Sequence, residues 1–168
     1  SKSSFTIDKN SSSAQIMMTA MGQGETLVSP YHMALITAAV ANGGTLMEPY
    51  LVDSITNYTG SEVSKNKPSS YAKLMTSEEA AQLKEYMKAV VDQGTATMLS
   101  GQSYTVAGKT GTAEYSSDKE KSHSWFVGFT NVDNPELVIS LIVEGYDGNA
   151  GGRAVPIAKT ILDSYYYR

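Results

Sequence analysis

The sequence predicts an α+β fold, an antiparallel sheet of three strands packed against helices. The strands are expected at residues 103–115, 122–131 and 136–144, three strand-like runs that follow one another closely. An Asp-Asn-Pro turn at 133–135 joins the last two, so we expect them to form a hairpin. Upstream of the strands, apolar residues recur at helical spacing instead. The two patterns together predict a sheet that is covered by helices.

Three helices are expected, at residues 29–44, 76–94 and 151–167. Ser29 suits the N-cap of the first helix and Pro30 its first turn. Thr76 and Glu79 have the spacing of a capping box at the start of the second. The two later helices carry apolar stripes predicted to face the core. These are Leu83, Met87, Val90 and Val91 in one, and Ala154, Ile157, Ala158, Ile161 and Leu162 in the other.

The remaining segments are expected to be less regular. Residues 45–57 should be extended, and the polar, proline-broken stretch 60–70 should be a loop. The first 20 residues are serine-rich and polar, which indicates a linker or a truncated edge of residues 1–168. The whole chain, residues 1–168, is expected to form one unit because 168 residues suffice for one core.

The composition excludes several classes of function. The formal net charge is −4 and no basic cluster occurs, which argues against a nucleic-acid partner. Cysteine is absent, and His32 and His123 lie far apart in the sequence, so neither a disulfide nor a metal site is expected. We expect no cofactor. No apolar run is long enough to span a membrane.

The chemistry is expected at the stretch Lys109-Thr110-Gly111-Thr112, on the first predicted strand. Lys109 offers a positive charge, and Thr110 and Thr112 point to the same side of a strand, so they can grip a carboxylate. Gly111 lets a ligand backbone approach, and free N–H groups at a strand edge can pair with an extended peptide or bind an oxyanion. The alternative is an ordinary edge strand with a solvated lysine and a bulge glycine.

The wider sequence resembles the penicillin-binding proteins. Their third motif is Lys-Thr-Gly, found here in AGKTGTAEY, and HSWFVGFTN is similar to the strand that follows it. Residues 22–52 and 90–99 resemble the segments that precede this motif. The matches cover nearly the whole chain in the family's order. They are most similar to class B penicillin-binding proteins, which are monofunctional transpeptidases.

The resemblance implies a peptidoglycan D,D-transpeptidase. A serine attacks a stem peptide ending in D-Ala-D-Ala and passes the acyl group to an amine; β-lactam antibiotics acylate the same serine. By this resemblance Lys109 and Thr112 are catalytic, with the Thr112 N–H forming half of the oxyanion hole. Thr110, Gly111 and Thr112 would bind the substrate carboxylate. Location at the extracytoplasmic face of the bacterial cell membrane is implied as well.

The first two family motifs, Ser-x-x-Lys and Ser-x-Asn, should precede residue 22 but do not occur there. Ser64, Ser70 and Ser116 match Ser-x-x-Lys by letters alone, and chance explains such matches. The nucleophile also needs the start of a buried helix, which none of the three positions offers. The sequence is therefore identified as the C-terminal part of the transpeptidase domain, lacking the nucleophile and predicted inactive alone.

The missing N-terminal half is expected to be a partner of this chain. In the family it supplies the two outer strands of a five-stranded sheet, so the strand at 136–144 would expose an apolar edge here. We expect that edge to be protected, for instance by an edge-strand dimer. Two alternatives stay open: a β-lactamase or β-lactam sensor domain, and a non-catalytic module that binds peptides at Lys109.

Overall fold

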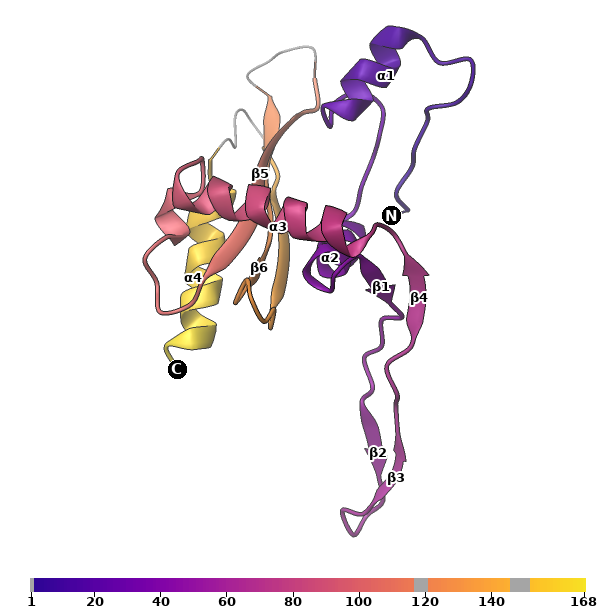
Figure 1. The fold of residues 1–168 in the computed structure, drawn as a ribbon, viewed down its shortest axis with the longest axis vertical. Helices are drawn as coiled ribbons and strands as arrows, with labels where there is room; N and C mark the ends of the chain where they lie inside the picture. Colours follow the sequence, from indigo (N-terminus) through magenta and orange to yellow (C-terminus); the bar gives the residue numbers. More distant parts are fainter. Residues whose placement is uncertain (1, 117–120, 146–151) are drawn as a thin grey trace.

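The body of the molecule is a three-stranded antiparallel sheet, as predicted (Figure 1). The computed structural model describes residues 2–116, 121–145 and 152–168. The strand order is β5-β6-β7, with both pairs antiparallel. The strands are β5 (Val106–Glu114), β6 (Ser122–Thr130) and β7 (Val138–Val143). Strand β6 lies in the middle, so β5 and β7 each have one edge without a strand partner.

Helices cover both faces of this sheet (Figure 1). They are α2 (Pro30–Ala41), α3 (Ser77–Asp92), the 3-10 turn η1 (Thr97–Leu99) and α4 (Ala154–Tyr166). The three helices α2, α3 and α4 were predicted, and so were the caps of the first two: Ser29 accepts the His32 N–H at 3.2 Å, and Thr76 and Glu79 form the capping box. Each cap satisfies backbone N–H groups that a helix start leaves without partners.

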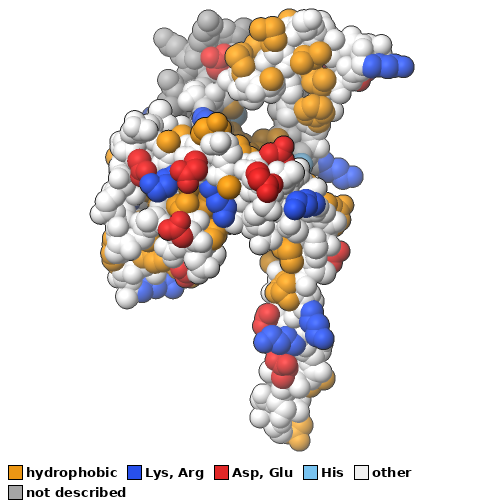
Figure 2. All heavy atoms as spheres, in the orientation of Figure 1, with side chains coloured by type: hydrophobic (Ala, Val, Ile, Leu, Met, Phe, Trp, Pro, Cys, Tyr) orange, Lys and Arg blue, Asp and Glu red, His pale blue; other side chains and the backbone are white. Residues whose placement is uncertain are grey.

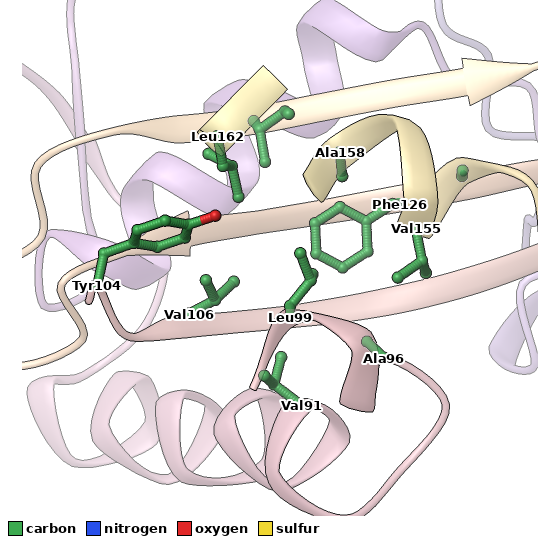
Figure 3. Packing of buried hydrophobic residues seen from close by; sticks show 11 residues of the cluster. Val91, Ala96, Leu99, Tyr104, Val106, Phe126, Val155, Ala158 and Leu162 are labelled. Carbon is green, nitrogen blue, oxygen red and sulfur yellow. The ribbon is translucent and has the colours of Figure 1, made fainter. Parts of the chain in front are cut away.

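The main core lies between the sheet, α4 and η1. Phe126 on β6 is fully buried there and is surrounded by Leu99, Val106, Val155 and Ala158 (Figure 3). A second cluster on the opposite face contains Val40, Ala41, Ala107, Phe129 and Val132. Alternate residues of β5 and β6 therefore enter opposite clusters, as the two-residue period of a strand requires.

Two of the predicted apolar stripes are wrong in part. Leu83 on α3 is exposed, because α3 crosses β5 and divides its buried side chains between the two clusters. On α4 the buried residues are Ala154, Val155, Ala158 and Leu162, whereas Ile157 and Ile161 are exposed. The two alanines allow a close approach to the sheet, and that approach fixes which side of α4 packs.

A polar network joins α4 to the chain before β5. The Tyr104 hydroxyl donates to Asp163 at 2.7 Å, and Lys159 contacts the same carboxylate. Burial raises the pKa of the Tyr104 hydroxyl well above its ordinary value, and the bond to Asp163 raises it further. The hydrogen bonds from Lys159 and Tyr104 lower the pKa of Asp163.

Residues 45–73 form a narrow β arm that projects from the body (Figure 1). It contains β1 (Thr45–Met47) paired with β4 (Ser70–Lys73), and β2 (Ser54–Thr56) paired with β3 (Glu62–Lys65). Every residue from 48 to 71 is exposed, and charged side chains of both signs lie along the arm (Figure 2). The prediction of an extended segment at 45–57 is confirmed in part.

The prediction of a loop at 60–70 is wrong at residues 62–65, which form strand β3. A turn at 57–60 brings β2 and β3 together: the Gly60 N–H donates to the Asn57 carbonyl at 3.0 Å, and Gly60 has a left-handed φ of 84°. Such a turn favours glycine. Pro68 lies between β3 and β4, where it breaks no ladder. The strands are short and polar, so their pattern gives little signal.

The first 20 residues, for which a linker or truncated edge is expected, include the helix α1 (Ser13–Ala20). Ser12 caps it through a capping box with Gln15. None of its residues is buried, and hydrophobic side chains lie on its surface (Figure 2). No helix in the described ranges is long and apolar enough to cross a membrane.

Candidate active site at the edge of strand β5

The backbone of β5 presents its even-numbered residues to the open edge of the sheet. Two contacts at the strand ends establish this: Asn131 N–H donates to the Thr105 carbonyl at 2.8 Å, and Tyr115 N–H donates to the Lys121 carbonyl at 3.2 Å. Odd-numbered residues of β5 thus pair with the β6 side. Because N–H and C=O of one strand residue point the same way, those of Thr110 and Thr112 face outward.

Two of the outward carbonyls of β5, those of Thr110 and Thr112, accept hydrogen bonds from side chains of this same chain. Lys109 Nζ donates to the Thr110 carbonyl at 2.7 Å, and Gln23 Nε2 donates to the Thr112 carbonyl at 3.0 Å. Within the described ranges, no acceptor contacts the N–H of Thr112. An outward N–H with no partner can bind an oxyanion or the carbonyl of an extended peptide.

Lys109 is exposed and lies on the face of β5 opposite to Thr110 and Thr112. Within residues 2–116, 121–145 and 152–168 it makes no ion pair. Its positive charge is therefore available to an anionic ligand, and its bond to the Thr110 carbonyl keeps the ammonium beside the open edge.

The hydroxyl of Thr110 pairs with that of Thr95, which follows α3, at 2.7 Å. One hydroxyl donates and the other accepts, so the pair keeps one O–H free to donate to a carboxylate. Thr112 is exposed on the same face of the strand. The two threonines thus share a side, as the sequence predicts, with Thr95 as an additional hydroxyl.

Two glycines in β5 are required by their neighbours. A Cβ on Gly108 would lie 2.5 Å from Phe126 Cζ and 2.9 Å from the Val127 carbonyl oxygen. A Cβ on Gly111 would lie 3.2 Å from Trp125 Cβ. Gly108 therefore accommodates the central ring of the core, and Gly111 lets Trp125 lie close beneath the Lys-Thr-Gly stretch.

The two histidines lie outside this constellation. His123 is the second residue of β6, where its ring stacks on Tyr115 with centroids 4.4 Å apart and its Nδ1 accepts the Gly145 N–H at 3.1 Å. His32 lies in the first turn of α2, and its backbone N–H donates to the Ser29 cap. Neither ring contacts Lys109, Thr110 or Thr112 among the described interactions. The ordered contacts of His123 instead hold the far end of β5 and β6.

None of the three serines that match Ser-x-x-Lys lies at the start of a buried helix, where a nucleophile is expected. Ser64 lies on β3 and Ser70 on β4, both on the exposed arm rather than at the start of a buried helix. Ser116 follows β5, and Lys119, the other half of that match, lies outside the described residues. The sequence does not predict Gln23 and Thr95 as site residues. For Gln23 the available signal is its place between Gly22 and Gly24, both of which have positive φ.

Comparison with known proteins gives the family. The model of the penicillin binding protein transpeptidase domain matches residues 2–163. The chain is 34% identical over 155 residues to stage V sporulation protein D of Bacillus subtilis, covering 86% of this chain and 23% of that protein. It is 29% identical over 155 residues to the peptidoglycan D,D-transpeptidase PbpA of Mycolicibacterium smegmatis, covering 89% of this chain and 31% of that protein.

Solved structures agree. The crystal structure of PBPA from Mycobacterium tuberculosis superimposes with a TM-score of 0.80 at 29% identity, covering 98% of this chain and 40% of that one. A ceftriaxone acyl-enzyme complex of penicillin-binding protein A from the same organism gives 0.83 at 27%, covering 99% and 38%. The chain thus spans about a quarter to a third of the curated relatives named above. It belongs to the penicillin-binding protein transpeptidase family, as a C-terminal part of a class B transpeptidase domain.

Proposed function

We propose that this chain supplies the Lys-Thr-Gly side of a peptidoglycan D,D-transpeptidase site. The observation that carries the proposal is the open edge of β5, where the Thr112 N–H faces outward beside the Lys109 ammonium and the Thr95–Thr110 hydroxyl pair. The family and the D,D-transpeptidase relative from Mycolicibacterium smegmatis support it.

The substrate is a stem peptide ending in D-Ala-D-Ala, bound as an extended strand along β5. The charge of Lys109 and the hydroxyls of Thr110 and Thr112 bind its terminal carboxylate. A serine from another part of the protein attacks the carbonyl carbon of the penultimate D-Ala. The oxyanion that forms accepts a hydrogen bond from the Thr112 N–H, and the terminal D-Ala leaves with a proton.

The acyl-enzyme is then attacked by an amine of a second stem peptide, which forms the cross-link and frees the serine. Lys109 also orders the serine's hydrogen-bond network in this proposal. β-Lactams enter the same reaction at its first step, and acyl-enzyme complexes with ceftriaxone, imipenem and penicillin G support this through the relative from Mycobacterium tuberculosis.

The nucleophile lies outside residues 1–168 in this proposal, so the chain alone is inactive. The exposed strand positions of Ser64 and Ser70 support this. The upstream half of the domain is the implied partner, and the free edge of β7 is the surface it covers. When that half is absent, two copies of the chain are expected to pair at this edge. The proposed location is the extracytoplasmic face of the bacterial membrane.

The test uses the longer protein that contains this chain, incubated with benzylpenicillin and followed by intact mass. We expect one penicillin per protein, retained for hours, with release of D-Ala from a pentapeptide blocked in parallel. Rapid loss of the adduct with turnover of penicillin would assign a β-lactamase instead. Binding of a D-Ala-D-Ala peptide without any adduct would assign a non-catalytic peptide-binding module.

A further inference from the structure

Gln23 reaches the candidate site from a segment 89 residues away in the sequence. Its side-chain amide donates to the outward carbonyl of Thr112 at 3.0 Å, the single side-chain hydrogen bond that Gln23 makes among the described contacts. Gln23 is half-buried and belongs to neither core cluster. Its contact with the edge of β5 is therefore not a by-product of core packing.

The backbone of Gln23 is fixed by the end of helix α1. Gly22 N–H donates to the Thr19 carbonyl at 3.0 Å, and Gln23 N–H donates to the Met18 carbonyl at 2.9 Å. With Gly22 at φ 80°, this is a Schellman motif, in which a left-handed glycine ends the helix. The next residue is thereby aimed away from the helix, and here that residue is Gln23. Only its side chain has to rotate to leave Thr112.

The Thr112 carbonyl is also the acceptor that a bound peptide needs. An extended ligand that pairs with the edge of β5 uses both outward groups of one residue, giving an acceptor to the Thr112 N–H and a donor to its carbonyl. In the proposed function, the reacting carbonyl of the ligand accepts the hydrogen bond from the Thr112 N–H. The Thr112 carbonyl then accepts a hydrogen bond from an amide N–H of the ligand, which occupies the place where the Gln23 amide N–H lies now.

We propose that Gln23 is a specificity-determining residue, a displaceable stand-in for the ligand's amide N–H at the Thr112 carbonyl. The inference rests on the proposed function of the β5 edge. A ligand that carries an amide N–H beside its reacting carbonyl must displace the Gln23 side chain, at the cost of one hydrogen bond. A ligand without that amide leaves Gln23 in place and gains nothing when Gln23 is removed.

The test compares acylation rates of the longer protein by two β-lactams. Benzylpenicillin carries an acylamino group beside its reactive carbonyl, whereas imipenem carries a hydroxyethyl group there. In Gln23→Ala the second-order acylation rate constant for benzylpenicillin is expected to rise about two- to tenfold, the equivalent of one net hydrogen bond. The rate constant for imipenem is expected to stay unchanged. Gln82→Ala, the same change on the exposed side of α3, is the matched control and should alter neither.

An equal loss with both compounds would overturn the inference, because it would show that Gln23 positions the strand for every ligand. An equal gain, or no change with either, would overturn it as well. If the unsubstituted protein is acylated by neither compound, the proposed function itself fails and the inference falls with it. Acylation of the unsubstituted protein therefore separates the two failures.

Discussion

The two free edges of the three-stranded sheet, on β5 and β7, differ in polarity and in whether side chains contact their outward backbone groups. On β5 the outward carbonyls of Thr110 and Thr112 are capped by Lys109 and Gln23, and the exposed residues are polar. Strand β7 is apolar at every position except Ser140. Within the described ranges, no hydrogen bond joins a side chain to the outward backbone groups of β7.

The pairing with β6 determines which residues of β7 present their backbone groups to the open edge. Thr130 N–H donates to the Leu137 carbonyl at 2.9 Å, so odd-numbered residues of β7 pair with β6. Val138, Ser140 and Ile142 therefore present their backbone groups outward. A capped polar edge suits a ligand that comes and goes, whereas an uncapped apolar edge suits permanent cover by another strand. The contrast supports the proposal that the β5 edge binds the ligand and that the β7 edge is covered by another strand.

The largest effect is expected from removing the charge at the polar edge. In the longer protein, Lys109→Ala should slow acylation by benzylpenicillin at least about 100-fold, the range for loss of one electrostatic contact to the reacting group. Lys73→Ala on the exposed arm is the control and should leave the rate unchanged. A large loss in Lys73→Ala instead would point to Ser70 as the nucleophile and break the assignment of the β5 edge.

The apolar edge is tested by Ser140→Pro, which removes one outward N–H but no bond to β6. The isolated chain is expected to self-associate through β7, and Ser140→Pro should convert it to monomer, as measured by size-exclusion with light scattering. Ser140→Ala keeps the N–H and should associate like the original chain. A monomeric original chain at high concentration would contradict the prediction.

Within β5, the buried part should tolerate less change than the ligand part. Gly108→Ala places a Cβ against the Phe126 ring and the Val127 carbonyl, so it should cost about 1–3 kcal/mol of unfolding free energy. Gly111→Ala meets only Trp125 Cβ, at 3.2 Å, and should cost less. Urea unfolding of both variants gives the order, and the reverse order would show that the close packing lies under the site instead.

The smallest effect, a pH-dependent change in the stability of the fold, is expected from a substitution at Asp163, far from both edges. Hydrogen bonds from Lys159 and Tyr104 lower the pKa of Asp163 below its ordinary value of 3.8, so its stabilising contribution is present at neutral pH. That contribution is lost as the pH falls through the lowered value. Asp163→Asn should therefore be less stable than the original chain at pH 7, and the two should converge in acid. Thermal unfolding across pH measures this, and a constant difference would exclude the carboxylate as its source.

The sequence predicts those parts of the fold that have long, regular patterns. Helices α2, α3 and α4 and the strands of the sheet carry clear periodicity, and Ser29 and Thr76 mark two helix starts. Strands β2 and β3 escape prediction because they are short and polar and depend on a local turn. The exposure of Ile157 and Ile161 escapes it because α4 has two adjacent apolar sides, and packing against the sheet selects between them.

The candidate site also has one part that the sequence predicts and one part that it does not. Lys109, Thr110, Gly111 and Thr112 are consecutive residues on a strand, so their motif is visible in the sequence. Gln23 and Thr95 reach the same edge from distant segments, 89 and 15 residues away from their partners. No local pattern encodes such contacts, because the fold of the intervening chain creates them.

We propose that the edge of β5 is one side of a transpeptidase site whose nucleophile lies in another part of the protein. The most direct test of this proposal is the intact mass of the 168-residue chain after incubation with excess benzylpenicillin. We expect no added mass on this chain, while the longer protein gains one penicillin. A stoichiometric adduct on the 168-residue chain, mapped to Ser64, Ser70 or Ser116, would contradict it.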